Sequence, residues 1–265
     1  MHCFLVYKDL AFETFYVNPL KVADELPLGH QIPVLSIDGE LRNDSTPIGQ
    51  WLEQRYPGRP RSLPADAAER ERVLAIDRWV SDTLVPVIMR LMLAVGEPLG
   101  VRVRNRRRGA RALHTTVPAG IPLPLRLAYP FVIARVGFLR RMIAATDLSR
   151  PNSAVFATAL EELLLRVAGG PFLGGLDGPT LADLSAYAQL ALPYMAGYDG
   201  IDAFMDKPEI LDWFLRVQER LDPGRPLLPR ALIERKLPAA SEHARVSESH
   251  AGYPCDTGSE RETGG

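Results

Sequence analysis

The pattern of the chain changes at a short proline-containing linker, residues 60–64, and this change restricts the fold most strongly. Before the linker, residues 12–17 (FETFYV) and 32–37 (IPVLSI) are rich in aromatic and β-branched side chains, which predicts two strands. After it, apolar residues recur at i, i+3 and i+4 from 65 to 95, which predicts one long helix in which Pro86 can introduce a kink. We therefore expect a small α/β unit followed by a helical unit.

The second predicted strand belongs to a hairpin. Asp38-Gly39 suits a two-residue turn, so Glu40-Leu41-Arg42 is expected to return as a further strand. The next residues, 43–46 (NDST), supply capping side chains, and apolar residues at helical spacing follow up to Tyr56. The segment that precedes the first predicted strand, Cys3 to Leu10, is expected to be the end of a helix.

The rest of the chain is mainly helical in pattern. Helices are expected at 131–142, 153–167, 181–194 and 208–221. Residues 98–130 contain an arginine cluster and several prolines, and we expect an irregular connection or insertion there. From about 238 the chain is polar and offers little to bury, so a disordered tail is expected.

Composition excludes several classes of protein. A formal net charge of −1 gives no global attraction to nucleic acid or anionic membrane. Arginines interrupt the apolar stretches, which argues against a transmembrane helix, and the N-terminus has no secretory pattern, so we expect a cytoplasmic protein. The only cysteines, Cys3 and Cys255, lie at opposite ends, and the histidines are scattered, so neither a disulfide framework nor a metal site is expected.

Two features have alternative interpretations. Cys3 lies in an apolar segment, and a buried structural cysteine is favoured over a catalytic thiol. The arginine cluster from Arg102 to Arg111 is favoured to be a solvated loop, with an acidic membrane surface or a nucleic-acid phosphate as the alternatives. The neighbouring 121–139 segment, apolar with spaced arginines, favours the membrane surface of these two alternatives.

These motifs together resemble a known family. The strand at 32–35, the following turn and the Asn43-Asp44-Ser45 cap resemble the second half of a glutathione-transferase thioredoxin domain. The capping box from Thr180 to Asp183, which follows PFLGG at 171–175, is similar to a folding element of the same family. The 171–221 region is most similar to the membrane-associated prostaglandin E synthase type 2 subgroup and its bacterial relatives.

The resemblance implies a site for glutathione. Pro33 would be a cis proline, and Val34 would pair its backbone with the cysteinyl part of glutathione. Ser45 would hold the γ-glutamyl carboxylate at a helix N-terminus, and Asp44 would face the amino group. Gln31 stands where the family often has a basic residue. A small hydrophobic substrate and a homodimer are consistent with this family, and no nucleic acid is expected.

The chain departs from the family at its start. Members of the subgroup begin with a strand and a Cys-Pro-x-Cys motif, whereas here the residues after Met1 already match the later apolar run. Either the protein is truncated or the start is misplaced at an internal valine codon, and the second explanation is favoured because the missing strand would be central in the sheet. No catalytic residue is therefore assigned.

The expected fold class is α+β then all-α: a thioredoxin-like N-terminal domain without its first strand, followed by a glutathione-transferase-type helical domain. The expected boundaries are 1–60, 66–237 with the insertion at 98–130, and a tail at 238–265. The expected function is glutathione-dependent thiol transfer or conjugation to a hydrophobic electrophile, with doubtful activity in this chain. The alternative is a non-catalytic, metaxin-like binding or scaffold module on the same fold.

Overall fold

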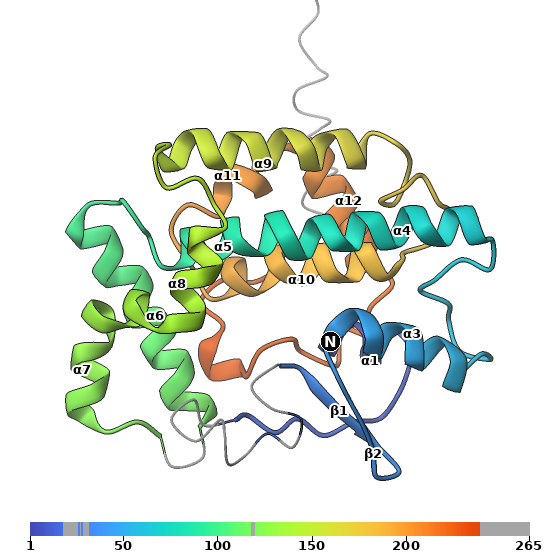
Figure 1. Cartoon of the computed structure of the whole chain (residues 1–265), viewed down its shortest axis with the longest axis horizontal. Helices are drawn as coiled ribbons and strands as arrows, with labels where there is room; N and C mark the ends of the chain where they lie inside the picture. The colour runs from blue at the N-terminus through green and yellow to red at the C-terminus, as the bar shows by residue number, and fades with distance from the viewer. Residues whose placement is uncertain (18–25, 27, 29–31, 118–119, 239–265) are drawn as a thin grey trace, which may run out of the picture.

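The computed structural model describes residues 1–17, 26, 28, 32–117 and 120–238 of the chain. The disorder expected in the C-terminal tail concerns residues 239–265, which lie outside this part, as does Gln31. A small sheet with two helices lies against a larger helical body (Figure 1). The expected order of a small α/β unit followed by a helical unit is confirmed.

The sheet is the predicted hairpin. Strands β1 (Val34–Ile37) and β2 (Glu40–Asn43) pair antiparallel, with Val34 opposite Asn43 and Ile37 opposite Glu40. The turn between them has positive φ at both central residues, 51° at Asp38 and 82° at Gly39, as a two-residue turn that follows the twist of the strands requires. Within the described residues, the sheet contains these two strands.

The strand predicted at 12–17 is wrong, because the structure has no regular secondary structure there. The aromatic side chains of this segment differ in burial. Phe12 packs on the core and against His2, whereas Phe15 is 83% exposed. A strand also needs a partner for its backbone groups, and no described segment pairs with this one.

Two helices cover the hairpin. Helix α1 (His2–Tyr7), which the sequence predicted as a helix end, and α3 (Ser45–Arg55) bury Leu5, Ile48 and Leu52 together. Leu35 and Ile37 of β1 pack against this cluster. The resulting small core fixes β1 and the N-terminus of α3 relative to one another.

The long helix predicted from 65 to 95 is present with an irregular centre. It consists of α4 (Ala67–Trp79), a π-helical segment η1 (Val80–Leu84) and α5 (Val85–Met92). Pro86 lies in the first turn after the π segment. A proline cannot donate a backbone hydrogen bond to the preceding turn, so the wider π turn accommodates it without ending the helix.

The irregular connection expected at 98–130 is wrong, because two helices occupy it: α6 (Leu99–Thr116) and α7 (Leu123–Val132). Most prolines there lie at helix starts, with Pro98 and Pro122 at the N-caps. The arginines are good helix formers, and they are held by partners distant in sequence, which the local pattern does not show.

The helix predicted at 131–142 is interrupted. Helix α7 ends at Val132, a 3₁₀ turn follows, and α8 (Gly137–Ala144) begins after it. The three later helices are present as predicted: α9 (Asn152–Val167), α10 (Leu181–Met195) and α12 (Pro208–Gln218). A short helix that was not predicted, α11 (Asp202–Met205), lies between α10 and α12.

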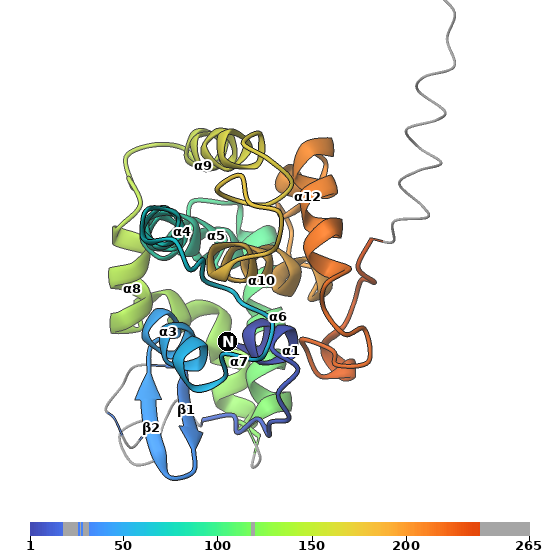
Figure 2. The same cartoon turned by 90° about the vertical axis from the view of Figure 1, so that its right-hand side faces the viewer.

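The main core lies where α4, α5, α9, α10 and α12 meet. Figure 2 shows α4, α9 and α10 almost end-on, with α12 beside them. Its largest side chains include Trp213, Tyr187 and Phe214, all at most 1% exposed. The predicted capping box at the start of α10 is present: Asp183 accepts from the Thr180 N–H, and it also accepts from the Trp213 indole at 2.8 Å. This buried carboxylate therefore ties the start of α10 to α12.

Among the described residues, no helix has both the length and the apolar character needed to cross a bilayer.

Candidate functional site

The predicted glutathione-binding residues that the structure describes lie at one place, where β1 begins and α3 follows β2. The Ile32-Pro33 peptide bond is cis, as the sequence predicted. The Asp44 N–H donates to the Pro33 carbonyl at 3.1 Å, so Pro33 and Asp44 extend the β1–β2 register by one pair. Gln31, the fifth predicted residue, lies outside the described part of the chain.

The register determines where the backbone of Val34 points. In an antiparallel pair, hydrogen-bonded residue pairs alternate with pairs that are not hydrogen-bonded. Because Asp44 bonds to Pro33, the next pair, Val34 with Asn43, is of the second kind. The N–H and C=O of Val34 therefore point away from β2, toward the edge of β1 that no described strand occupies. An extended peptide can pair with such an edge.

The N-terminus of α3 lies next to this edge. Asp44 is its N-cap residue and has a φ of 70°, in a region that non-glycine residues seldom adopt. This conformation turns the chain sharply from β2 into the first turn of α3, so that Ser45 starts the helix. The first N–H groups of the helix and the Ser45 hydroxyl thus form a place suited to a carboxylate.

A buried carboxylate that the sequence analysis missed contacts the first turn of α3 from the side of the helical body. Asp77 of α4 is 1% exposed and accepts a hydrogen bond from the hydroxyl of Thr46. Burial raises the pKa of Asp77, and the nearby Asp44 carboxylate adds to this effect, while the Thr46 hydrogen bond opposes it. The sequence signal was a single aspartate in an otherwise apolar stripe of the long helix, which is a weak signal by itself.

A glycine allows α3 to approach the helical body. Gly49 faces the side chain of Leu181, and a Cβ atom at this position would lie 2.1 Å from the Leu181 Cδ1. Leu181 is the first residue of α10, and its N–H donates to the Ser62 carbonyl at 2.7 Å. The start of α3 is therefore positioned by contacts with both α4 and α10.

Cys3 is buried, as the sequence predicted. It is 1% exposed in α1, and burial raises the pKa of its thiol to about 11. A thiol is nucleophilic only as the thiolate. This position therefore does not supply a reactive thiolate near neutral pH. Among the described residues, no group of three or more His, Cys, Asp or Glu side chains is arranged to hold a metal ion.

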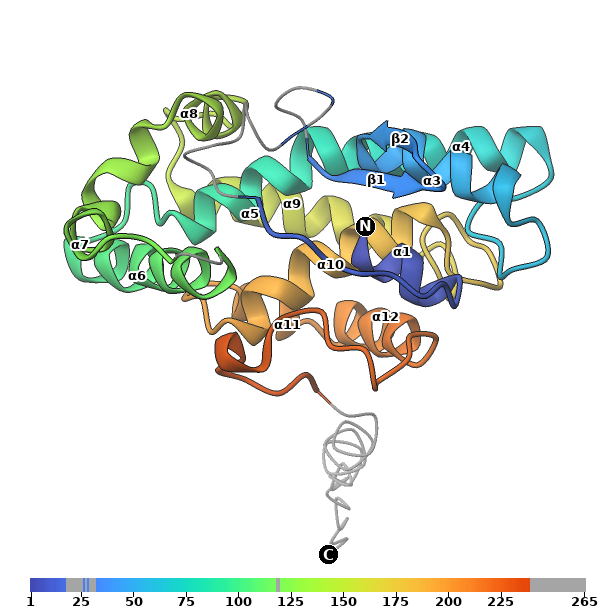
Figure 3. The same ribbon diagram turned by 90° about the horizontal axis from the view of Figure 1, so that it is seen from below.

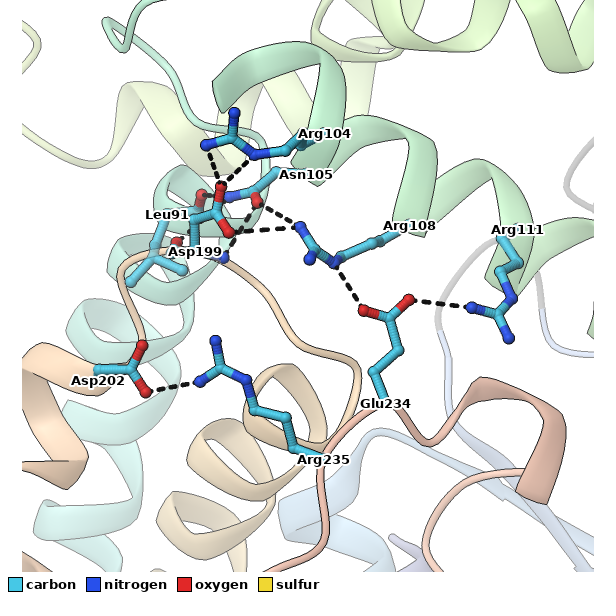
Figure 4. Close-up of polar contacts among 9 residues, drawn as sticks. All are labelled: Leu91, Arg104, Asn105, Arg108, Arg111, Asp199, Asp202, Glu234 and Arg235. Atoms are coloured by element: carbon cyan, nitrogen blue, oxygen red, sulfur yellow. Dashed lines mark hydrogen bonds and ion pairs between the residues drawn. The ribbon is translucent and has the colours of Figure 1, made fainter. Parts of the chain in front are cut away.

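The arginine cluster is not the solvated loop that was expected. Arg104, Arg108 and Arg111 project from one face of α6 toward two carboxylates, Asp199 and Glu234 (Figure 4). Arg108 bridges both, at 3.4 Å from Asp199 Oδ1 and 3.2 Å from Glu234 Oε2.

Two more residues of the cluster region are buried. Asn105 donates to the Leu91 and Asp199 carbonyls and accepts from the Asp199 N–H. The guanidinium of Arg106 donates to the Leu93 and Pro130 carbonyls at 2.8 Å each. These residues attach α6 to the helical body and are not available to a phosphate.

A pocket of about 540 Å³ lies between the ends of α5, α6 and α9. Its lining is mostly apolar, with Leu91, Val101, Phe156 and Leu160 among the side chains. The pocket is at the α5 end of the long helix. Helix α3 lies beside α4, the other part of this long helix, as Figures 1 and 3 show. The pocket is therefore separate from the β1–α3 site.

A small α/β unit with a cis proline and a helical domain behind it define a glutathione-transferase-type fold. No family model matches the chain. It is 26% identical to Protein LigF of Sphingobium sp. (strain NBRC 103272 / SYK-6) over 226 residues. The aligned region covers 82% of this chain and 83% of LigF.

A solved glutathione transferase shares this fold. Glutathione transferase GSTFuA2 from Phanerochaete chrysosporium superposes with a TM-score of 0.51 at 16% identity, covering 83% of this chain and 88% of that structure. The crystal structure of beta-etherase LigF from Sphingobium sp. strain SYK-6 has a TM-score of 0.47 at 22% identity, covering 80% of this chain and 92% of that one. The expected fold class is confirmed.

Proposed function

We propose that this chain binds glutathione at the β1–α3 site. The observation that carries the proposal is the backbone edge of Val34 that no described strand occupies, which follows a cis proline and lies beside the N-terminus of α3. The peptide backbone of glutathione can pair with Val34, while its γ-glutamyl carboxylate can accept from Ser45 and the first N–H groups of α3. Asp44 faces the γ-glutamyl amino group in this proposal, and Gln31 completes the set.

The proposed reaction is thiol transfer or conjugation of glutathione to a small hydrophobic electrophile. The similarity to LigF, a protein named as a beta-etherase, supports an organic substrate for this reaction. The finer resemblance to the prostaglandin E synthase type 2-like subgroup, a cytoplasmic location, a homodimer and the domain boundaries at 60 and 66 stay predictions. We assign no catalytic residue.

A non-catalytic binding module is the second candidate, and Cys3 favours it. This cysteine is buried, and its thiol pKa is about 11, so it does not act as the thiolate of a redox motif. A binding module of this kind would keep the fold without turning over an electrophile.

Calorimetric titration with glutathione tests the proposal. The unmodified chain should bind, and Ser45→Ala should weaken binding by about tenfold or more, because a hydrogen bond to a charged carboxylate is lost. Ser81→Ala, which removes an exposed hydroxyl from the π segment of the long helix, is the matched control and should bind like the unmodified chain.

Absence of heat and of retention on immobilised glutathione would reject the site. Binding without any conjugation of a panel of aromatic electrophiles would favour the binding module over the transferase.

A further inference from the structure

Helix α7 carries an apolar face that the rest of the described chain leaves uncovered. Leu123, Leu127 and Phe131, spaced four residues apart, are 57%, 62% and 59% exposed. Residues at i, i+4 and i+8 share one side of a helix. The other side packs on α6, where the Tyr129 ring lies against Gly109. We call Leu123, Leu127 and Phe131 the α7 face.

The segment that contains this face is basic and has no acidic side chain. Residues 98–146 contain ten arginines and no lysine, aspartate or glutamate, although the whole chain has a net charge of −1. Four of these arginines form hydrogen bonds or ion pairs with other residues of the chain: Arg104, Arg106, Arg108 and Arg111. Five others are exposed and form no ion pair within the described part of the chain: Arg107, Arg126, Arg135, Arg140 and Arg141.

We propose that the α7 face is a docking surface for an anionic lipid bilayer. Exposed leucine and phenylalanine side chains can enter the boundary between headgroups and acyl chains, while exposed arginines of the same segment, such as Arg126 on α7 and Arg135 just after it, bind lipid phosphates. Both contributions are needed, because three apolar side chains alone bury little area. Helix α7 would lie parallel to the membrane plane at the end of the molecule that Figures 1 and 3 show opposite to α3.

Charge favours a membrane over the other partners that an apolar face could bind. In a symmetric contact with a second copy, the α7 faces would meet and bring the unpaired arginines of both copies together. A nucleic acid would use the arginines but gives no role to a central stripe of leucine and phenylalanine, because phosphate contacts are polar. An anionic bilayer satisfies the apolar and the basic components at once.

Co-sedimentation with vesicles tests this proposal on the full chain. Binding is expected to vesicles of phosphatidylcholine mixed with phosphatidylglycerol, and little binding to phosphatidylcholine alone. Raising the salt concentration should reduce binding, since it screens the arginine contribution. The double variant Leu127→Ser/Phe131→Ser and the double variant Arg126→Gln/Arg140→Gln should each reduce the bound fraction at least about fivefold.

The control is Leu165→Ser, which removes a leucine that is 75% exposed on α9 and should leave vesicle binding unchanged. All these positions are exposed, so thermal unfolding should be nearly unchanged, and glutathione binding should be the same in every variant. That last measurement separates a failure of this proposal from a failure of the proposed glutathione site.

Three results would overturn the proposal: no sedimentation with anionic vesicles, sedimentation that neither double variant reduces, or a dimer that Leu127→Ser/Phe131→Ser converts to monomer. Retention on DNA that depends on the arginines but not on Leu127 and Phe131 would assign the surface to nucleic acid instead.

Discussion

The side-chain hydroxyl of Thr46 donates a hydrogen bond to the buried carboxylate of Asp77, and this contact joins the first turn of α3 to α4. It connects the small α/β unit to the helical body at the residue that follows Ser45. The proposed glutathione site therefore depends on a residue from the helical part of the chain, which makes it sensitive to changes in α4.

Asp77→Asn should alter how stability depends on pH. Burial raises the pKa of Asp77 above its ordinary value of 3.8, so the folded state holds this proton more tightly than the unfolded state. The free energy of unfolding therefore declines as pH rises through the window between these two values. The variant lacks this decline, so in denaturant unfolding its stability relative to that of the unmodified chain should increase as the pH rises above about 4.

Asp82→Asn, at an exposed position of the π segment, is the control for this experiment and should track the unmodified chain. A difference between Asp77→Asn and the unmodified chain that stays constant over this pH range would contradict the assignment.

Gly49→Ala should destabilise the protein by about 1–3 kcal/mol, because the new methyl group would overlap Leu181, which is fully buried and cannot move freely. Chemical unfolding measures the effect. Gly58→Ala, where a Cβ atom meets nothing within 4 Å, should cost much less. Equal unfolding midpoints for the two variants would show that α3 does not pack closely on α10.

Cys3 should be unreactive in the folded protein. Its thiol is buried with a pKa of about 11, so very little thiolate exists near neutral pH and access is blocked. In a Cys255→Ser background, an aromatic disulfide reagent should label Cys3 only after denaturant is added, which absorbance follows directly. Rapid labelling of the native chain would reveal an accessible thiol and reopen a chemical role for α1.

Arg90→Met should cost about 3 kcal/mol or more in the free energy of unfolding. The buried Arg90 guanidinium donates to Asn152 Oδ1 at 2.6 Å and to the Asp147 and Arg150 carbonyls at 2.8 Å each. Methionine would leave these acceptors without a donor. Arg78→Met, at an exposed position on the same long helix, should change stability by less than about 0.5 kcal/mol in the same assay.

Local patterns predicted those features whose cause is local. The hairpin turn at Asp38-Gly39, the capping box at Thr180 and the long helix with Pro86 follow from backbone preferences and short-range hydrogen bonds. Pro33, Val34, Asp44 and Ser45 were assigned to a site by the resemblance to the glutathione-transferase family, and the structure places them on one hairpin and the helix after it. Such features need few contacts with the rest of the chain.

The predictions from the sequence were wrong where contacts between distant residues decide the structure. The 12–17 segment has a strand-like composition but no described strand to pair with. The arginine-rich segment was expected to be an irregular, solvated loop, yet it is a helix held by Asp199 and Glu234, which follow it by about ninety residues or more. A periodicity shows which side chains lie on one face, but it does not show which carboxylates that face meets.

The sequence by itself determined the order of the two units, the hairpin and the capping box, because nearby residues fix these through backbone geometry. Only the tertiary structure decided that Asp77 supports the start of α3, that α6 is attached through its arginines, and that the α7 face stays exposed. Each of these depends on residues far apart in the chain, and burial or charge pairing between them exists only after the chain has folded.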